Sequence, residues 1–310
     1  MNTSQLIAVS IAAALVSGTP ILWAAVGELF AEKVGVFNVG IEGVMLMGAV
    51  SAFVVAFNTD NALLGLVAGF VVGVLFIALF AFVTCILGAD QLVCGIALVL
   101  IGIGASNQIG QPYVTQISQA TIAAWHVPFL SEIPFVGRAV FQEPWLVYLS
   151  WIVVAGAHFL FKYTRHGMNL RAIGEDPDSA EAAGIPVVRW RILYVLFSGG
   201  LIGLGGAFIT LGDVGQWNDL VTGGAGWIAL AVVIVSNWRP LPIVAIAYLF
   251  GAMRILGSVG QSLGWPIPSD VLSALPFLAT LLFLVVQVWR YRRTPGFNAG
   301  PAALGQVFAR

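Results

Sequence analysis

The chain has 310 residues, of which 59% are hydrophobic and only 9% are charged, and its formal net charge is -1. A typical soluble domain carries about 25% charged residues, and a chain with so few charges cannot cover a surface that faces water. The composition therefore argues against a soluble enzyme and predicts a polytopic membrane protein. The near-zero net charge gives no sign of nucleic-acid binding. The two cysteines, Cys85 and Cys94, lie in apolar stretches and are interpreted as small buried hydrophobic residues.

Apolar runs follow one another along most of the chain, and a helix needs about 20 mostly apolar residues to cross a bilayer. The runs cover residues 5–27, 34–57, 62–87, 91–110, 144–162, 190–211, 226–237, 240–259 and 269–289. The run 226–237 is too short to cross comfortably, which predicts a broken or re-entrant helix packed in protein. We therefore predict an all-α membrane protein with a bundle of about 8–9 transmembrane helices. Its expected parts are a transmembrane domain over 1–290, with loops at 111–143 and 163–189, and a tail over 291–310.

The second apolar run contains an unusual polar motif, GVFNVGIEGVMLMGA, over residues 35–49. A carboxylate inside a membrane is costly, so Glu42 is by default a candidate functional residue. On one continuous helix Gly35, Asn38 and Glu42 share a face, and we expect this face to point into the bundle, with Asn38 hydrogen-bonded to Glu42. Three interpretations of Glu42 are open: a structural pin, a pore-lining residue, and the proton relay of a secondary transporter.

Several features limit the chemistry of the chain. It lacks the G-x-x-x-x-G-K-(S/T) loop that cradles phosphates, so we do not expect the chain to bind ATP itself. His126, His158 and His166 are scattered, and no metal pair or Ser–His–Asp arrangement can be argued from them. The glycine-rich stretch over 199–208 lies inside an apolar run and is interpreted as close helix packing. An intramembrane enzyme is therefore the weakest function class for this sequence.

The 163–189 loop contains a small helix with clear start and stop signals, in the stretch NLRAIGEDPDSAEAAGI over 169–185. Asp176 suits the N-cap, because its carboxylate can accept the free amides of the first turn. Pro177 suits the first helical position, where no amide hydrogen is needed. Gly184 suits the position that ends the helix, and Pro186 prevents its continuation. These signals predict one helix of about two turns. It is either a solvated connector or a protruding helix that seats in a groove of a partner.

Basic residues predict the orientation of the chain, because cytoplasmic loops carry an excess of Lys and Arg. If the 163–189 loop is cytoplasmic, only Arg138 and Arg254 lie on the opposite side. The N-terminus is then outside and the C-terminal tail is cytoplasmic. The 111–143 loop lies outside and is interpreted as a lid or docking surface, or equally as packed filler. The basic residues on the cytoplasmic side are Lys33, Lys162, Arg165, Arg171, Arg189, Arg191, Arg239, Arg290, Arg292, Arg293 and Arg310.

The stretch over 169–185 resembles the coupling-helix loop of ATP-binding-cassette (ABC) importer permeases. The family of branched-chain amino acid, ribose and nucleoside permeases carries a pattern close to N-L-R-A-(I/V)-G-E-(N/D)-P-x-A-A-(E/D)-A-A-G-I. The chain departs from it at Ser179, a small residue in place of a small residue. The resemblance implies a helix that docks on a cytosolic ATPase and passes on its closing motion. The residues it assigns to this coupling loop are Arg171, Glu175, Asp176, Pro177, Ala180, Glu181, Ala182, Ala183 and Gly184.

The motif over 35–48 resembles the nucleoside branch of the same family, whose members read close to G-x-F-N-(I/V)-G-x-E-G-x-M-L-x-G. Two further stretches are similar to family segments. DQLVCGIAL over 90–98 has Cys94 where Ser is usual, and GGAGWIALAVVIVSNWRP over 223–240 has Asn237 where a basic residue is usual. Any role of that basic residue is therefore in doubt here. The matching positions in the first motif are Gly35, Phe37, Asn38, Val39, Gly40, Glu42, Gly43, Met45, Leu46 and Gly48.

The resemblance implies the permease subunit of a bacterial ABC importer for nucleosides or related purine compounds, in the cell membrane and without a cofactor of its own. Its expected partners are cytosolic ABC ATPase subunits, a second permease subunit (identical or related), an external solute-binding protein or lipoprotein, and membrane lipid. Ribose, another simple sugar or a branched-chain amino acid is the alternative solute. A proton-coupled secondary transporter that uses Glu42 is the alternative class. The pore candidates, where aromatic faces would stack a base and amides would meet ribose hydroxyls, are Phe37, Asn38, Glu42, Gln91 and Trp227.

Overall fold

A computed structural model of the protein describes residues 3–262, 264, 268, 271–272, 274–293 and 300–308. Their regular structure is helical, apart from three isolated β-bridges. Short π-helical turns extend α3 over Phe82–Ile86 and α9 over Ile209–Asp213, and a 3-10 turn over Gln111–Tyr113 extends α4. In chain order the helices are α1 Thr3–Lys33, α2 Ile41–Thr59, α3 Ala62–Ala81, α4 Gln91–Gly110, α5 Val136–Val140, α6 Trp145–Tyr163, α7 Arg165–Glu175, α8 Pro177–Ala182, α9 Val187–Phe208, α10 Ala225–Val235, α11 Pro240–Ser262 and α13 Leu275–Arg293.

The helices confirm the all-α polytopic prediction. Helix α10 has 11 residues and is too short for a crossing, as predicted for the seventh run, and α13 adds the shorter apolar stretch Leu275–Val286. Among the described residues, 7 segments are long and apolar enough to cross a membrane: Gln5–Lys33, Ile41–Thr59, Ala62–Ile86, Gln91–Tyr113, Trp145–Tyr163, Val187–Asp213 and Pro240–Gly257.

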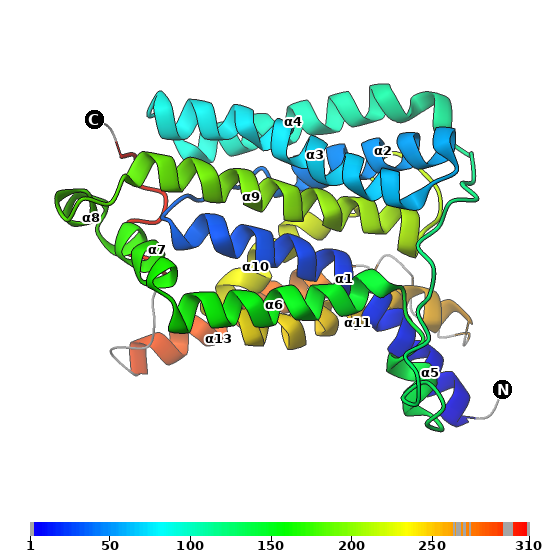
Figure 1. Ribbon diagram of the computed structural model, residues 1–310. Helices are drawn as coiled ribbons and strands as arrows, with labels where there is room; N and C mark the ends of the chain where they lie inside the picture. Colours follow the sequence, from blue (N-terminus) through cyan, green and yellow to red (C-terminus); the bar gives the residue numbers. More distant parts are fainter. Residues whose placement is uncertain are drawn as a thin grey trace.

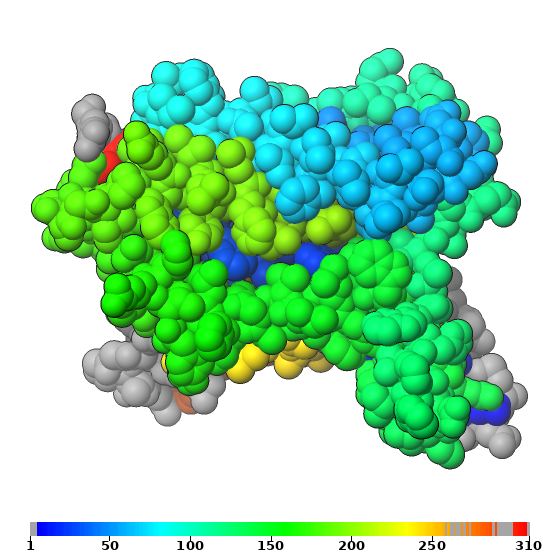
Figure 2. All heavy atoms as spheres, viewed as in Figure 1, coloured from blue at the N-terminus to red at the C-terminus, as the bar shows by residue number. Residues whose placement is uncertain are grey.

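The long helices lie side by side with their axes roughly aligned (Figure 1). The start of α1 and helix α5 lie at one end of the bundle, and α7, α8 and the C-terminal residues lie at the other (Figure 1). Helix α9 is central, because it packs against α1, α2 and α3. On the face drawn in Figure 2, α1 is visible mainly in a groove between α9 and α6. The two ends of the bundle therefore present different parts of the chain.

The contacts of α9 with α2 and α3 depend on glycine. A Cβ atom added to Gly206 would lie 2.0 Å from the carbonyl oxygen of Met45 in α2, and one added to Gly199 would lie 2.6 Å from that of Gly73 in α3. Neither distance leaves room for a side chain, so the helices pack backbone against backbone, as small residues allow in membrane proteins. The interpretation of the 199–208 stretch as close helix packing is confirmed.

The predicted start of the second span is wrong. Helix α1 continues to Lys33, α2 begins at Ile41, and residues 34–40 form a non-helical link between them. Gly35 has a φ of 78°, a left-handed conformation that ends the helix and that glycine adopts without a steric penalty. Asn38 is therefore not on a helix, and the expected common face of Gly35, Asn38 and Glu42 does not form.

Among the described side chains, most of the basic residues lie at the end of the bundle that carries α7 and α8 (Figure 1), in agreement with the expected charge bias. Arg191 lies there too, because its Nε donates to the carbonyl oxygen of Val34 at 3.0 Å. Arg254, an exception to the bias, is half-buried, and its Nη2 donates to the carbonyl oxygen of Thr222 at 3.4 Å. The side chains of Arg290, Arg292, Arg293 and Arg310 lie outside the described residues. One pocket at this end is lined by Lys33, Lys162, Arg171 and Arg239.

The 111–143 loop packs along the opposite end, against residues that follow α9. The amide of Ile122 donates to the carbonyl oxygen of Leu211 at 2.9 Å, and that of Ser118 to Gly215 at 3.4 Å. At its end Glu143 is 5% exposed. Burial raises the pKa of Glu143 from 4.5 to about 7, because the charged form loses its hydration.

This raised pKa predicts a pH-dependent stability for the protein. The folded state holds the proton of Glu143 more tightly than the unfolded state, so its stabilising effect is present at low pH and is lost as the pH rises toward 7. In that window the free energy of unfolding falls by up to about 1.4 kcal/mol per pH unit. Thermal unfolding of the purified protein across this range tests the prediction, and Glu143→Gln should flatten the dependence. The exposed Glu132→Gln is the matched control, and an unchanged slope in Glu143→Gln contradicts the assignment.

Candidate functional site: the coupling loop and the buried carboxylates

The 163–189 loop folds into two helices, α7 and α8, where the sequence predicted one. The hydroxyl oxygen of Thr164 caps α7 by accepting the amide of Gly167 at 3.1 Å. Leu170 and Ile173 of α7 are fully buried, so this helix is attached to the bundle by an apolar side. Arg165 and Arg171, which were counted only as basic residues from the sequence, therefore belong to a helix that attaches α8 to the bundle.

The predicted signals of the small helix are confirmed. Asp176 Oδ1 accepts the amide of Ser179 at 3.1 Å, and its other oxygen accepts the hydroxyl of the same residue. These hydrogen bonds from Ser179 lower the pKa of Asp176, so the cap is ionised at neutral pH. Pro177 is the first helical residue. Gly184 has a φ of 87°, and the amide of Ile185 closes the helix end on the carbonyl oxygen of Ala180 at 3.1 Å.

The coupling-loop residues divide between an inner and an outer side. Pro177 and Ala180 are buried against the bundle, and Glu181 is half-buried. The outer side presents small, acidic and basic groups. Its exposed members are Arg171, Glu175, Asp176, Ala182, Ala183 and Gly184.

The end of α7 is fixed to the end of α1. A Cβ atom on Gly174 would lie 2.5 Å from the carbonyl oxygen of Lys33, so only glycine permits this approach. The amide of Ala303, in the C-terminal residues, donates to the carbonyl oxygen of Gly174 at 2.9 Å. The amide of Ala302 donates to Glu175 Oε2 at 3.3 Å. The loop is therefore in direct contact with both the end of α1 and the C-terminal residues.

The α1–α2 link is held by side chains from distant parts of the fold. The amide of Asn38 donates to Glu28 Oε1 at 3.0 Å, and Asn38 Oδ1 accepts the amide of Gly40 at 2.9 Å. The amide of Phe37 donates to Gln91 Oε1 at 2.7 Å. The expected hydrogen bond between Asn38 and Glu42 is therefore wrong, because the break in the helix turns Asn38 toward its own backbone.

Arg191 and residues 305–308 pack against the α1–α2 link and against each other. Arg191 is 3% exposed, its guanidinium donates to the carbonyl oxygen of Gln306 at 3.4 Å, and it lies 5.5 Å from the ring of Phe308. Gln91 Nε2 donates to the same carbonyl oxygen at 3.3 Å. The amide of Gly305 reaches the link at the carbonyl oxygen of Gly35, at 3.2 Å. Link, coupling loop and C-terminal residues form one packed block.

Glu42 lies at the start of α2 and is 5% exposed. One of its oxygens accepts the hydroxyl of Thr222 at 2.5 Å and the amide of Gly224 at 3.1 Å. The other accepts the amide of Gly226 at 2.7 Å. The charge meets the amide-rich start of α10, where the helix dipole favours an anion. This geometry favours the structural-pin interpretation of Glu42.

The hydrogen bonds of Glu42 also explain how the short seventh segment is tolerated. Residues 214–224 contain no α-helix before α10 begins, so their backbone groups lack helical partners. Non-helical backbone at membrane depth must be satisfied inside the protein. Glu42 accepts one hydroxyl and one amide from this region and a second amide, that of Gly226, from the first turn of α10, and Arg254 donates to the carbonyl oxygen of Thr222. The prediction of a broken element packed in protein agrees with this arrangement.

The five pore candidates do not form one cluster. Phe37, Asn38 and Gln91 belong to the packed block around the link. Glu42, at the start of α2, contacts the start of α10 by accepting the amide of Gly226, and Trp227 is the next residue of α10. The Trp227 side chain is 40% exposed, whereas Asn38 is fully buried. Among these candidates the large exposed surface is therefore that of Trp227.

Four residues at this end of the bundle were missed by the sequence reasoning. The first predicted span stopped at residue 27, so Glu28 and Glu32 fell outside it, although both are buried in α1. Arg191 was counted only among the basic residues of the cytoplasmic side. Trp238 Nε1 donates to Glu32 Oε2. Glu28 and Glu32 are four residues apart, a spacing that places both on one face of a longer helix. This spacing was the signal in the sequence that could have revealed them. The missed residues are Glu28, Glu32, Arg191 and Trp238, all buried or half-buried.

Residues 10–286 match the model of a family described as "Branched-chain amino acid transport system / permease component". The chain belongs to this family. It is therefore a multi-pass membrane permease of an ABC transporter, and the family is one of transport proteins and not of enzymes. This membership confirms the family resemblance, and the docking role of the 163–189 loop stays a prediction.

Three relatives cover nearly the whole permease. A putative glucose ABC transporter permease protein of Haloferax volcanii is 33% identical, over 95% of each chain. A nucleoside ABC transporter permease protein of Lactococcus lactis is 33% identical, over 92% of this chain and 94% of the relative. A guanosine ABC transporter permease protein of Bacillus subtilis is 29% identical, over 99% and 100%. The similarity is thus spread along the fold and is not confined to one motif.

Proposed function

We propose that the protein is the membrane subunit of an importer for nucleosides or related purine compounds. The observation that carries the proposal is the near full-length similarity to permeases named for nucleosides and for guanosine. The 35–48 motif, which resembles the nucleoside branch, adds to it. ATP is hydrolysed by separate cytosolic ATPase subunits, and an external solute-binding protein or lipoprotein delivers the solute.

In this proposal α8 is the element that meets the ATPase. The exposed Ala182 and Ala183 allow close approach of a groove wall. Closing of the ATPases pushes α8 and α7, and the contact of Gly174 with the end of α1 carries the motion into the bundle. The hydrogen bonds of Ala302 and Gly305 carry the same motion to the α1–α2 link. The link then shifts the start of α2, which holds Glu42.

The proposed pore contacts differ in kind. Trp227 has an exposed indole that can stack on a purine or pyrimidine base as it passes. Phe37 is half-buried in the link and offers a second aromatic face. Asn38, Glu42 and Gln91 accept hydrogen bonds from backbone amides. In this proposal they fix the position of the backbone around the passage.

The orientation and the permease partner belong to the same proposal. The N-terminus and the 111–143 loop face outside, where the binding protein docks, and the coupling loop and C-terminus face the cytoplasm. Helix α4 is our candidate contact for a second permease subunit, identical or related, because it is strongly apolar and most of its side chains are not buried. Its exposed apolar side chains are Leu92, Val93, Ile96, Leu100, Ile101 and Ile109.

Glucose or another simple sugar is the second candidate solute. The relative from Haloferax volcanii, named as a putative glucose permease, is as similar to this chain as the nucleoside permease from Lactococcus lactis. A purine nucleoside differs from a sugar by its flat aromatic base. Stacking on Trp227 would therefore matter for a nucleoside far more than for glucose.

Uptake of a labelled panel tests the proposal. Adenosine, guanosine, uridine, glucose, ribose and leucine are supplied to cells with and without this gene, before and after ATP depletion. We expect deletion to remove ATP-dependent nucleoside uptake. Loss of glucose or ribose uptake instead overturns the solute and keeps the mechanism. Gene-dependent uptake that survives ATP depletion and collapses with the proton gradient overturns the ABC assignment in favour of a secondary carrier.

A further inference from the structure

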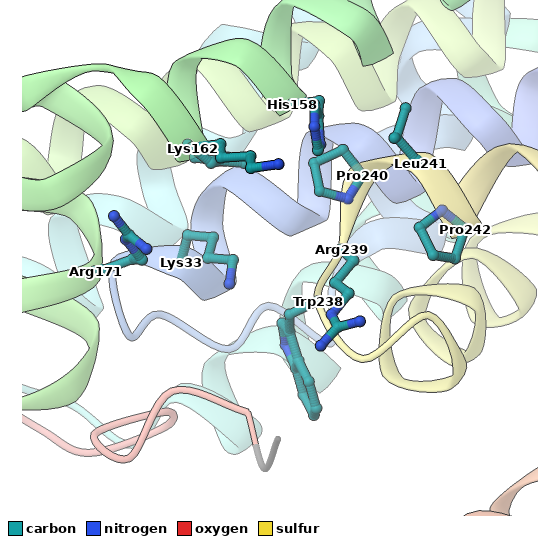
Figure 3. A pocket seen from close by; sticks show the side chains of 10 residues that line it. Lys33, His158, Lys162, Arg171, Trp238, Arg239, Pro240, Leu241 and Pro242 are labelled. Atoms are coloured by element: carbon teal, nitrogen blue, oxygen red, sulfur yellow. The ribbon is translucent and has the colours of Figure 1, made fainter. Parts of the chain in front are cut away.

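A pocket of about 510 Å³ lies at the coupling-loop end of the bundle, where α1, α6, α7 and the start of α11 meet. It is separate from the pore candidates, none of which lines it. Figure 3 shows the charged ends of its basic side chains around one shared space. Its lining residues are Lys33, His158, Phe161, Lys162, Arg171, Trp238, Arg239, Pro240, Leu241 and Pro242.

The charge of this pocket is strongly positive. Lys33, Lys162, Arg171 and Arg239 contribute four basic groups. The carboxylates that act on Lys33 are Glu32 and Glu175. These two carboxylates face four basic side chains. Each also accepts a neutral N–H donor, Glu32 from Trp238 Nε1 and Glu175 from the amide of Ala302, which leaves its charge unchanged. The pocket therefore has more positive charge than the nearby carboxylates balance, and an anion would be attracted to it.

The pocket lies where three of the candidate membrane spans begin or end, which corresponds to the edge of a membrane. Lys33 is the last residue of the first candidate span, Lys162 is next to last in the fifth, and Pro240 is the first of the seventh. Apolar side chains continue from the cations along the start of α11, where Leu241 is 53% exposed. The site thus offers cations at the water boundary and an uncovered apolar surface beside them.

We propose that this pocket binds the phosphate headgroup of an anionic phospholipid from the cytoplasmic leaflet. Exposed Lys162, in α6, and exposed Arg239, which directly precedes α11, meet the phosphate, and the acyl chains lie against Leu241 and its neighbours. Basic pockets between membrane helices suit such headgroups, because they pair charge with access from the bilayer. The bound headgroup lies next to Arg171 of the coupling loop and next to Trp238, whose Nε1 donates to Glu32.

Native mass spectrometry of the full-length protein, purified with the subunits that accompany it, tests this proposal. Phosphatidylglycerol, phosphatidylcholine and inorganic phosphate are titrated separately. We expect one tightly held phosphatidylglycerol per chain. The double variant Lys162→Gln/Arg239→Gln should weaken it by roughly 10- to 30-fold, since each basic group near a membrane surface contributes about a factor of five. The readout needs neither solute nor ATP, so it is independent of the proposed transport function.

The matched control removes the same charge from the same end of the bundle. Arg165→Gln/Arg189→Gln changes two exposed residues that do not line the pocket, and phosphatidylglycerol binding should stay unchanged. Leu241→Ser should weaken binding of the lipid while leaving inorganic phosphate unaffected. Equal weakening in the control pair would show diffuse surface attraction, and equal binding of phosphatidylcholine would remove the role of charge. Inorganic phosphate that displaces the lipid at comparable concentration would identify a free anion as the occupant. Each of these three results overturns the proposal.

Discussion

Replacing Ala183 with Glu is expected to abolish ATP-driven uptake while leaving the protein in the membrane. Ala183 is exposed at the end of α8, and its side chain supports no contact that the fold needs. In the docked state the new carboxylate would lie in a groove built for a small residue. An unpaired charge in an interface costs several kcal/mol, so uptake should fall roughly 10-fold or more. Transport of the solute identified in the uptake panel, normalised to the amount of protein in the membrane, is the measurement.

Two further substitutions at this position separate charge from size. Ala183→Ser adds one polar atom and should retain most uptake. Ala183→Gln has the size of Glu without its charge, and its uptake should lie between the two. Co-purification of the ATPase subunits should follow the same order as uptake. Normal uptake and normal co-purification in Ala183→Glu would remove α8 from the coupling interface.

Replacing Glu42 with Ala is expected to lower stability and uptake together. The substitution leaves the hydroxyl of Thr222 and the amides of Gly224 and Gly226 without their acceptor. Each buried donor without a partner costs about 1–3 kcal/mol, so a loss of about 3 kcal/mol or more is expected. Thermal unfolding of the purified protein and uptake in cells measure the two effects.

Glu42→Gln distinguishes the pin from a proton relay. Both oxygens of Glu42 accept hydrogen bonds, and an amide group can replace only one of them, so Gln should lower stability by less than Ala does. A relay predicts that Gln abolishes uptake without any loss of stability. The exposed Asp219→Asn, in the segment that Glu42 holds, controls for the loss of a negative charge there. Unchanged stability in Glu42→Ala would contradict the pin.

Much of the coupling loop was predictable because its signals are local. Asp176, Pro177 and Gly184 act within a few residues of one another, through a cap, a fixed φ and a left-handed turn. The prediction of α8 therefore needed no knowledge of the fold. Helix α7 was missed because its buried side, with Leu170 and Ile173, depends on the bundle beneath it. A short helix of this kind gains most of its stability from packing.

The pore candidates show the opposite case. The continuous helix expected over the 35–49 motif is interrupted because Glu28 and Gln91 satisfy the freed amides of Asn38 and Phe37. Gln91 lies 54 residues from the amide that it accepts. A helix pattern cannot reveal such an alternative, because the competing hydrogen bonds come from elsewhere in the fold.

By itself, the sequence determined that this is an all-α membrane permease with a short, capped helix over Pro177–Ala182. Those features follow from composition and from contacts between near neighbours. The tertiary structure alone decided where α1 ends, what Glu42 binds and where the C-terminal residues lie. The donors that meet Glu42 are between 180 and 184 residues away, and Gln306 lies 215 residues from Gln91. A buried polar group must find a partner wherever the fold provides one, and no local pattern encodes that choice.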